Sequence, residues 1–69
     1  MAIDICVRVG RRIRALREQS GWTQQILADH AQIAREHVCR IEDGRKEMGI
    51  RTLEKIASAL GKNVEELLR

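Results

Sequence analysis

The chain has 69 residues, a formal net charge of +3 and one aromatic residue, Trp22. A chain this short forms one small domain, and without other aromatic residues its core must be aliphatic. No apolar run approaches the roughly 18 residues of a membrane-spanning helix, and the first residues lack the order of a secretory leader. We therefore expect a cytoplasmic protein that does not associate with membranes.

Cysteine and histidine, the residue types that most often bind metals, occur only at Cys6, His30, His37 and Cys39. No pair has the C-x-x-C or H-x-x-x-H spacing of a zinc site, and two distant cysteines make no disulfide framework. The chain also has no glycine-rich phosphate loop and no nucleophile beside a recognisable base. We expect no metal, no cofactor and no enzymatic activity.

The first predicted element is a helix over residues 3–19, ended by Ser20 and Gly21. Its apolar residues recur at spacings of four, four and three, which is typical of one buried stripe. The remaining faces are rich in arginine, which favours either contact with phosphates or, for most of these residues, a solvated face. The stripe consists of Ile5, Val9, Ile13 and Leu16, and the arginines are Arg8, Arg11, Arg12, Arg14 and Arg17.

The next stretch, residues 23–44, indicates two short helices separated by a break near Gln32. The hydroxyl of Thr23 can cap the first of these helices. The second is predicted over residues 34–43, and Gly44 is a natural left-handed stop.

On a helical wheel, residues 34–43 separate into a narrow apolar stripe and a polar face. The polar side chains can read base edges, arginine being suited to guanine above all. Two short helices across a tight turn have the layout of a DNA-binding helix-turn-helix, but also that of two bundle helices with a solvated outer face. The stripe consists of Ala34, Val38 and Ile41, and the polar face of Arg35, Glu36, Cys39, Arg40 and Asp43.

A short basic loop, Arg45-Lys46, follows, and then a fourth helix is predicted over residues 50–60. A last short helix begins after Asn63, with Glu66 in the position of a capping-box partner. The sequence thus predicts an all-α fold of five helices in one domain over residues 1–69. The fourth helix should bury Ile50, Leu53, Ile56, Ala57 and Leu60, and the fifth has an apolar side of Val64, Leu67 and Leu68.

The order of these motifs resembles the phage-repressor and Cro-like family of regulators, also called XRE. The resemblance implies a compact five-helix, lambda-repressor-like DNA-binding domain with its helix-turn-helix at about residues 23–43. It implies a sequence-specific transcriptional repressor or activator that binds double-stranded DNA. The resemblance runs without gaps through VGRRIRALR (9–17), GWTQ (21–24), LA (27–28), IEDGR (41–45) and TLEKIASALG (52–61).

By position, the resemblance makes residues 34–43 the recognition helix, which would enter the major groove. Gln24 matches a glutamine that bonds a phosphate while bracing this helix, and Arg17 and Glu42 match a structural ion pair. His37 would lie at the edge nearer the phosphates. The base-facing positions would be Arg35, Glu36, Cys39 and Arg40, and the contacts to the DNA backbone beyond the helix would come from Arg45 and Lys46.

Two departures from the family pattern fall at the turn between the two helices. Gln32 stands where glycine is usual, although a left-handed conformation is uncommon for such a residue. Ala34 stands where a serine or threonine usually caps the recognition helix, which removes a bond worth about 1 kcal/mol.

The resemblance also implies a homodimer through the last two helices, with Val64, Leu67 and Leu68 as the dimerisation residues. A two-fold dimer would bind a palindromic operator with half-sites roughly 10 bp apart. The alternative reading is an antitoxin or adaptor with the same fold, a protein-interaction module whose acidic residues Glu36, Glu42 and Asp43 face a protein partner.

Overall fold

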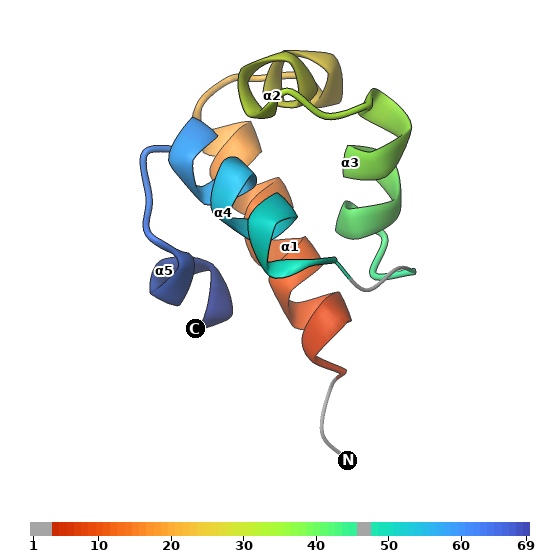
Figure 1. Ribbon diagram of the computed structural model, residues 1–69, viewed down its shortest axis with the longest axis vertical. Helices are drawn as coiled ribbons and strands as arrows, with labels where there is room; N and C mark the ends of the chain where they lie inside the picture. The colour runs from red at the N-terminus through yellow and green to blue at the C-terminus, as the bar shows by residue number, and fades with distance from the viewer. Residues whose placement is uncertain (1–3, 46–47) are drawn as a thin grey trace.

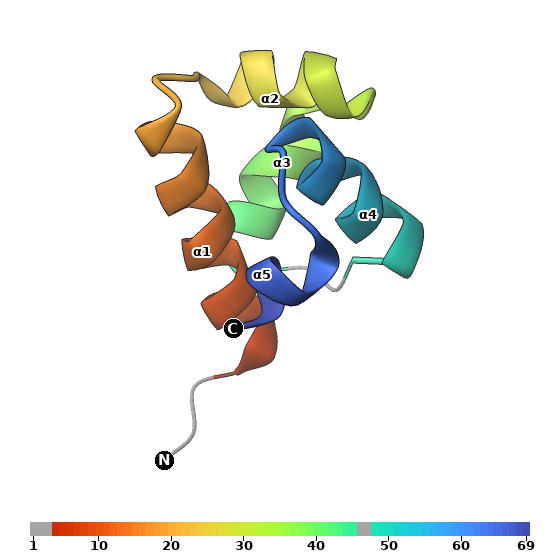
Figure 2. The same cartoon turned by 90° about the vertical axis from the view of Figure 1, so that its left-hand side faces the viewer.

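The computed structural model describes residues 4–45 and 48–69, and every regular element within these ranges is a helix. The long helix α1 runs diagonally through the molecule, α2 crosses one end of it, and α3 and α5 lie on opposite sides (Figures 1 and 2). The prediction of an all-α, five-helix fold is confirmed. The helices are α1 (Ile5–Gln19), α2 (Gln24–Ala31), α3 (Arg35–Glu42), α4 (Ile50–Ala59) and α5 (Val64–Leu68).

The core is aliphatic and receives side chains from all five helices. It confirms the stripe predicted for α1, except for Ile5, which is 53% exposed. The prediction was also wrong for Ile50, the first residue of α4, which is 82% exposed. Both isoleucines continue a buried stripe into the first turn of a helix, where the packed elements no longer cover them. The core residues are Val9, Ile13, Leu16, Leu27, Ala28, Ala31, Val38, Ile41, Leu53, Ile56, Ala57 and Leu67.

Side-chain caps set the first residues of three helices. The carboxylate of Asp4 accepts from the amide of Cys6 at 2.7 Å, so α1 starts at Ile5, two residues later than predicted. The hydroxyl of Thr23 accepts from the amide of Ile26 at 3.1 Å, and Asn63 and Glu66 form the predicted capping box of α5.

Two of the α1 arginines hold α5 in place. Arg8 Nη2 donates to the carbonyl oxygen of Leu68 at 3.0 Å, and Arg12 Nε donates to that of Glu66 at 3.2 Å. The last carbonyls of a helix lack partners within the helix, and cationic donors satisfy them well. These two arginines therefore act within the subunit, through contacts that were not predicted from the sequence.

Glycine lets the end of α3 rest directly on α1. A side chain at Gly10 would collide with the carbonyl oxygens of Ile41 and Glu42. Gly44 has a φ of 70° and lies against the backbone of Val7. The backbones of α1 and α3 thus meet without intervening side chains, which fixes the position of α3.

Candidate nucleic-acid interface

The helix-turn-helix consists of α2, a left-handed turn residue and α3. Gln32 has φ 59° and ψ 43°, so it adopts the conformation that glycine adopts more readily. The amide of Ile33 then donates to the carbonyl of Ala28 at 3.0 Å, which closes the turn. Ala34 occupies the N-cap of α3 without a side-chain capping bond. Both departures from the family pattern are therefore accommodated by the backbone.

A buried ion pair anchors the C-terminal end of α3 to α1. Arg17 donates from Nε to Glu42 Oε2 at 2.7 Å and from Nη2 to Glu42 Oε1 at 3.0 Å, so the pair is bidentate. Arg17 Nη1 also donates to the carbonyl of Trp22 at 2.8 Å. The hydrogen bond to Glu42 raises the pKa of Arg17 above its ordinary value. The structural pair expected from the sequence is thus present.

Gln24, the first residue of α2, joins this network. Its Nε2 donates to Glu42 Oε1 at 3.1 Å, which braces α2 against α3. The Glu42 side chain is only 1% exposed, so it is not available to a protein partner. The expectation that Glu42 would face such a partner is therefore wrong, because the carboxylate is enclosed by α1 and α2 donors.

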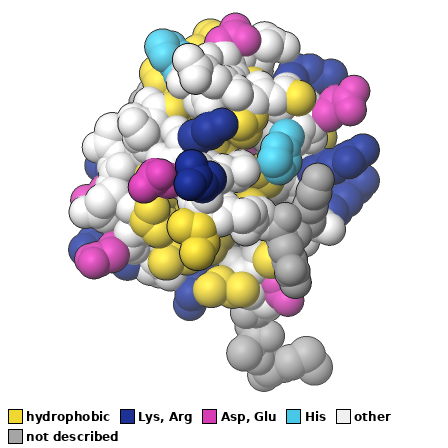
Figure 3. Space-filling view, viewed as in Figure 1, with side chains coloured by type: hydrophobic (Ala, Val, Ile, Leu, Met, Phe, Trp, Pro, Cys, Tyr) yellow, Lys and Arg dark blue, Asp and Glu magenta, His cyan; other side chains and the backbone are white. Residues whose placement is uncertain are grey.

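The opposite face of α3 borders a shallow, open hollow of about 200 Å³. All four residues predicted to face the bases line it, together with two charged residues that follow α3, Asp43 and Arg45. In Figure 3 basic side chains gather along this edge of the molecule with an acidic group among them. The lining residues are Arg35, Glu36, Cys39, Arg40, Asp43 and Arg45.

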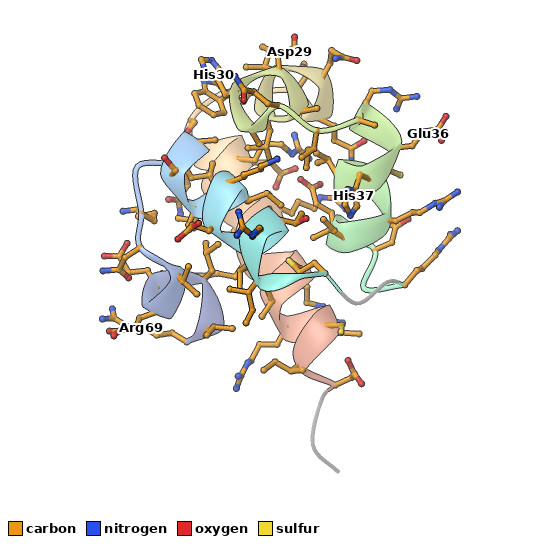
Figure 4. The ribbon with its side chains drawn as sticks, viewed as in Figure 1. Asp29, His30, Glu36, His37 and Arg69 are labelled. Carbon is orange, nitrogen blue, oxygen red and sulfur yellow. The ribbon has the colours of Figure 1, made fainter. Side chains whose placement is uncertain are left out.

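Within the hollow, Asp43 contacts two neighbours. The thiol of Cys39 lies 3.9 Å from Asp43 Oδ2, in the position of a weak hydrogen bond, and Arg45 Nε lies 3.7 Å from the same oxygen. Glu36 projects away from the body of the molecule (Figure 4) and forms no ion pair with any described residue. The face is therefore a mixture of three basic and two acidic groups rather than a uniform cationic patch.

His37 does not line the hollow. It is half-buried and projects from a different side of α3 than Glu36 does (Figure 4). This location fits the edge position expected for it better than a base-reading position. Lys46, the second residue of the predicted basic loop, lies outside the described residues.

The last helix does not present the dimerisation residues as predicted. Leu67 is fully buried in the core of its own subunit, because α5 packs this side chain against α1 and α4, so the assignment of Leu67 to a dimer surface was wrong. Val64 is half-buried, whereas Leu68 is 38% exposed. Leu68 borders an open apolar hollow of about 260 Å³, which is also lined by Ile5, Cys6, Val9, Met48 and Leu53.

Sequence reasoning missed the exposure of two apolar residues, one of which lines this hollow. Ile5 and Ile50 fall on the periodic stripes of their helices, so their spacing placed them in the core. No local signal distinguishes a first-turn residue that is covered from one that is not.

The described residues form neither a membrane-spanning helix nor a cluster of metal ligands. None of their helices is long and apolar enough to cross a membrane. None of their histidine, cysteine and acidic side chains form a group of three or more that could hold a metal ion.

A short helix braced by a buried network, with its polar face turned outward across a tight turn, defines a helix-turn-helix domain. The family model for the helix-turn-helix domain matches residues 8–69. The chain therefore belongs to the helix-turn-helix domain family, and the resemblance to the phage-repressor and Cro-like regulators is confirmed.

Two proteins that are named as repressors are similar in sequence to most of this chain. It is 34% identical over 59 residues to the competence pilus inhibition repressor of Acinetobacter baylyi, covering 86% of this chain and 54% of that protein. It is 38% identical over 60 residues to the immunity repressor protein of Bacillus phage phi105, covering 87% of this chain and 42% of that protein. The chain thus spans about half the length of these two relatives.

A solved structure of similar size also matches. The restriction–modification controller protein C.AhdI from Aeromonas hydrophila superposes with a TM-score of 0.88 at 32% sequence identity. The match covers 90% of this chain and 94% of that one. The fold of this chain therefore matches that of a protein described as a restriction–modification controller.

Proposed function

We propose that this chain is a sequence-specific DNA-binding transcriptional regulator that inserts α3 into the major groove. The observation that carries the proposal is the outward face of α3, where Arg35, Arg40 and Arg45 border one hollow while the opposite face is buried. Relatives named as repressors and controllers support the same conclusion. Because these relatives come from bacteria and a phage, we place the protein with the DNA in the cytoplasm.

In the proposed complex, some side chains of α3 and the following loop contact bases and others contact phosphates. Arg35 and Arg40 are long enough to reach base edges, where arginine pairs with the O6 and N7 atoms of guanine. Arg45, and Lys46 after it, contact the DNA backbone beyond α3, and His37 lies at the edge of that contact.

Gln24 serves both the protein and the DNA. One amide hydrogen of its Nε2 is directed at Glu42, and the second remains able to donate to a phosphate. The N-terminal amides of α2 favour the same anion. Gln24 thus links the phosphate backbone to the network that holds α3.

We propose further that the protein acts as a homodimer on a palindromic operator. The surface that supports this is the apolar hollow, which is lined by the exposed side chains of Ile5 and Leu68. A domain this small gains stability by covering such surface with a second copy. The two recognition helices would then enter successive major grooves about 34 Å apart.

Selection of bound duplexes from a random pool tests the proposal. The expected result is one enriched motif, made of two inverted half-sites with centres roughly 10 bp apart. A pool that stays random after repeated rounds would contradict DNA reading. It would instead favour a protein partner, as in an antitoxin or adaptor.

A further inference from the structure

The three acidic residues in the C-terminal half of the helix-turn-helix have different surroundings. Glu42 is buried and receives bonds from Arg17 and Gln24. Asp43 has Arg45 and the thiol of Cys39 close to its carboxylate. Glu36 is exposed and has no ion-pair or hydrogen-bond partner among the described residues. The carboxylate of Glu36 is therefore available to a ligand that binds to the outer face of α3.

The lack of a partner for Glu36 does not follow from its spacing. Arg40 lies four residues further along α3, an arrangement in which a glutamate and a basic residue often pair. Helix α1 has the converse arrangement, and there Arg14 Nε lies 3.5 Å from Glu18 Oε2. Glu36 and Arg40 instead form no ion pair, and both line the same hollow. Each side chain thus remains free to meet a separate group on the DNA.

A carboxylate on a DNA-reading face is selective because it can only accept hydrogen bonds. Phosphates repel it, and so do the exposed acceptor atoms of guanine and thymine in the major groove. Cytosine offers its N4 amino group, and adenine offers N6 but with the acceptor N7 beside it. Cytosine is therefore the base edge that best satisfies Glu36.

We propose that Glu36 is a specificity-determining residue that selects a cytosine in each half-site and weakens binding to duplexes without one there. This inference rests on the proposed function of α3 as the recognition helix. The proposed role explains how the negative charge of Glu36 can contribute to DNA binding, although on its own it would repel the DNA phosphates.

Helix geometry limits where the selected cytosine lies. Four residues of α-helix rise about 6 Å, and successive base pairs are separated by about 3.4 Å. Even if α3 ran along the DNA axis, the backbone positions of Glu36 and Arg40 would be separated by no more than about two base-pair steps. The selected cytosine should lie within about two steps of the guanine read by Arg40.

The test compares Glu36→Gln with Glu65→Gln. Glu65 is a matched control because it is the exposed second residue of α5, as Glu36 is of α3, so both variants lose one negative charge near a helix N-terminus. Thermal unfolding verifies that both variants fold. Fluorescence anisotropy then measures the affinity of each protein for three duplexes. The first is the duplex enriched by the wild type, and the second is the same duplex with the selected cytosine·guanine pairs replaced by thymine·adenine. The third is a scrambled duplex.

The wild type and Glu65→Gln should prefer the cytosine-bearing duplex to the thymine-bearing one by about tenfold, within the range of a good base contact. Glu36→Gln should lose most of this preference and bind the scrambled duplex more tightly than Glu65→Gln does. If Glu36→Gln keeps the wild-type preference for the cytosine-bearing duplex, the proposed role is wrong while DNA reading by α3 stands. A wild type that enriches no motif would overturn the proposed function and this role together.

Discussion

Arg17 uses every nitrogen of its guanidinium to hold the helix-turn-helix together. Two of them bond the buried carboxylate of Glu42, and the third bonds the carbonyl of Trp22. The bond to Glu42 raises the pKa of Arg17. A raised pKa means that this stabilisation is complete below the unfolded-state pKa and is lost only as pH rises through the folded-state pKa, in strongly alkaline solution. We therefore expect Arg17 to add no pH dependence to stability between about pH 5 and pH 9.

We predict that Arg17→Met lowers the free energy of unfolding by about 3–5 kcal/mol, because it leaves the carboxylate of Glu42 buried without its ion partner. Urea unfolding measures the change. The matched control is Arg14→Met, which breaks the exposed pair with Glu18 and should cost less than about 1 kcal/mol. Similar losses in the two variants would show that the buried pair does not hold α3.

The family pattern allowed the pair of Arg17 and Glu42 to be expected, whereas the contacts of the exposed charged residues of α3 could not be predicted. Arg17 and Glu42 were recognised from their positions in a family pattern. Whether Glu36 would pair with Arg40 depends on side-chain directions around α3, which spacing does not determine. The same holds for Cys39, whose thiol lies beside Asp43.

At the scale of the element, the turn between α2 and α3 shows how much local sequence can predict. The side chain of Thr23 caps α2 as its residue type predicts. The positions of Gln32 in the turn and of Ala34 at the start of α3 were expected only from the family pattern. The first turns of α1 and α4 were predicted less well. Ile5 and Ile50 have the spacing of core residues, but burial depends on which other helix covers them.

We predict that Ala34→Ser stabilises the domain by about 1 kcal/mol, because a serine hydroxyl can accept from an amide of the first turn of α3. The control is Ala15→Ser, an exposed position in the middle of α1, where serine should destabilise slightly. Thermal unfolding at fixed protein concentration compares the two. A gain at both positions, or at neither, would contradict the assignment of Ala34 as the N-cap.

At the scale of the whole molecule, burial decides which apolar residues belong to the subunit and which remain for a partner. The sequence placed Val64, Leu67 and Leu68 on one apolar side of the last helix. The structure separates them, because Leu67 completes the core while Leu68 borders the apolar hollow. A periodic pattern identifies the apolar side of a helix but not the point at which the subunit ends and a partner begins.

We predict that Leu68→Asp shifts the protein from dimer towards monomer and leaves the fold intact, whereas Leu67→Ala costs about 2–5 kcal/mol of stability as a core truncation. Sedimentation velocity over a range of concentrations, alone and with the enriched duplex, measures assembly, and circular dichroism measures folding. One chain per operator in the wild type would contradict the proposed homodimer. An unchanged dimer in Leu68→Asp would place the interface elsewhere on the surface.

The central claim is that α3 reads DNA bases, and a comparison of discrimination by three proteins tests it most directly. The wild type, Arg40→Ala and Arg51→Ala are titrated against the enriched duplex and a scrambled duplex at one salt concentration. Arg51 is an exposed arginine of α4 that does not line the α3 hollow, so its loss controls for net charge.

Arg40→Ala should lose about 1–3 kcal/mol of binding free energy at the enriched duplex and less at the scrambled one, because a base contact exists only at the correct sequence. Arg51→Ala should keep the wild-type ratio of the two affinities. If Arg40→Ala also keeps that ratio, then α3 is not the helix that reads the bases.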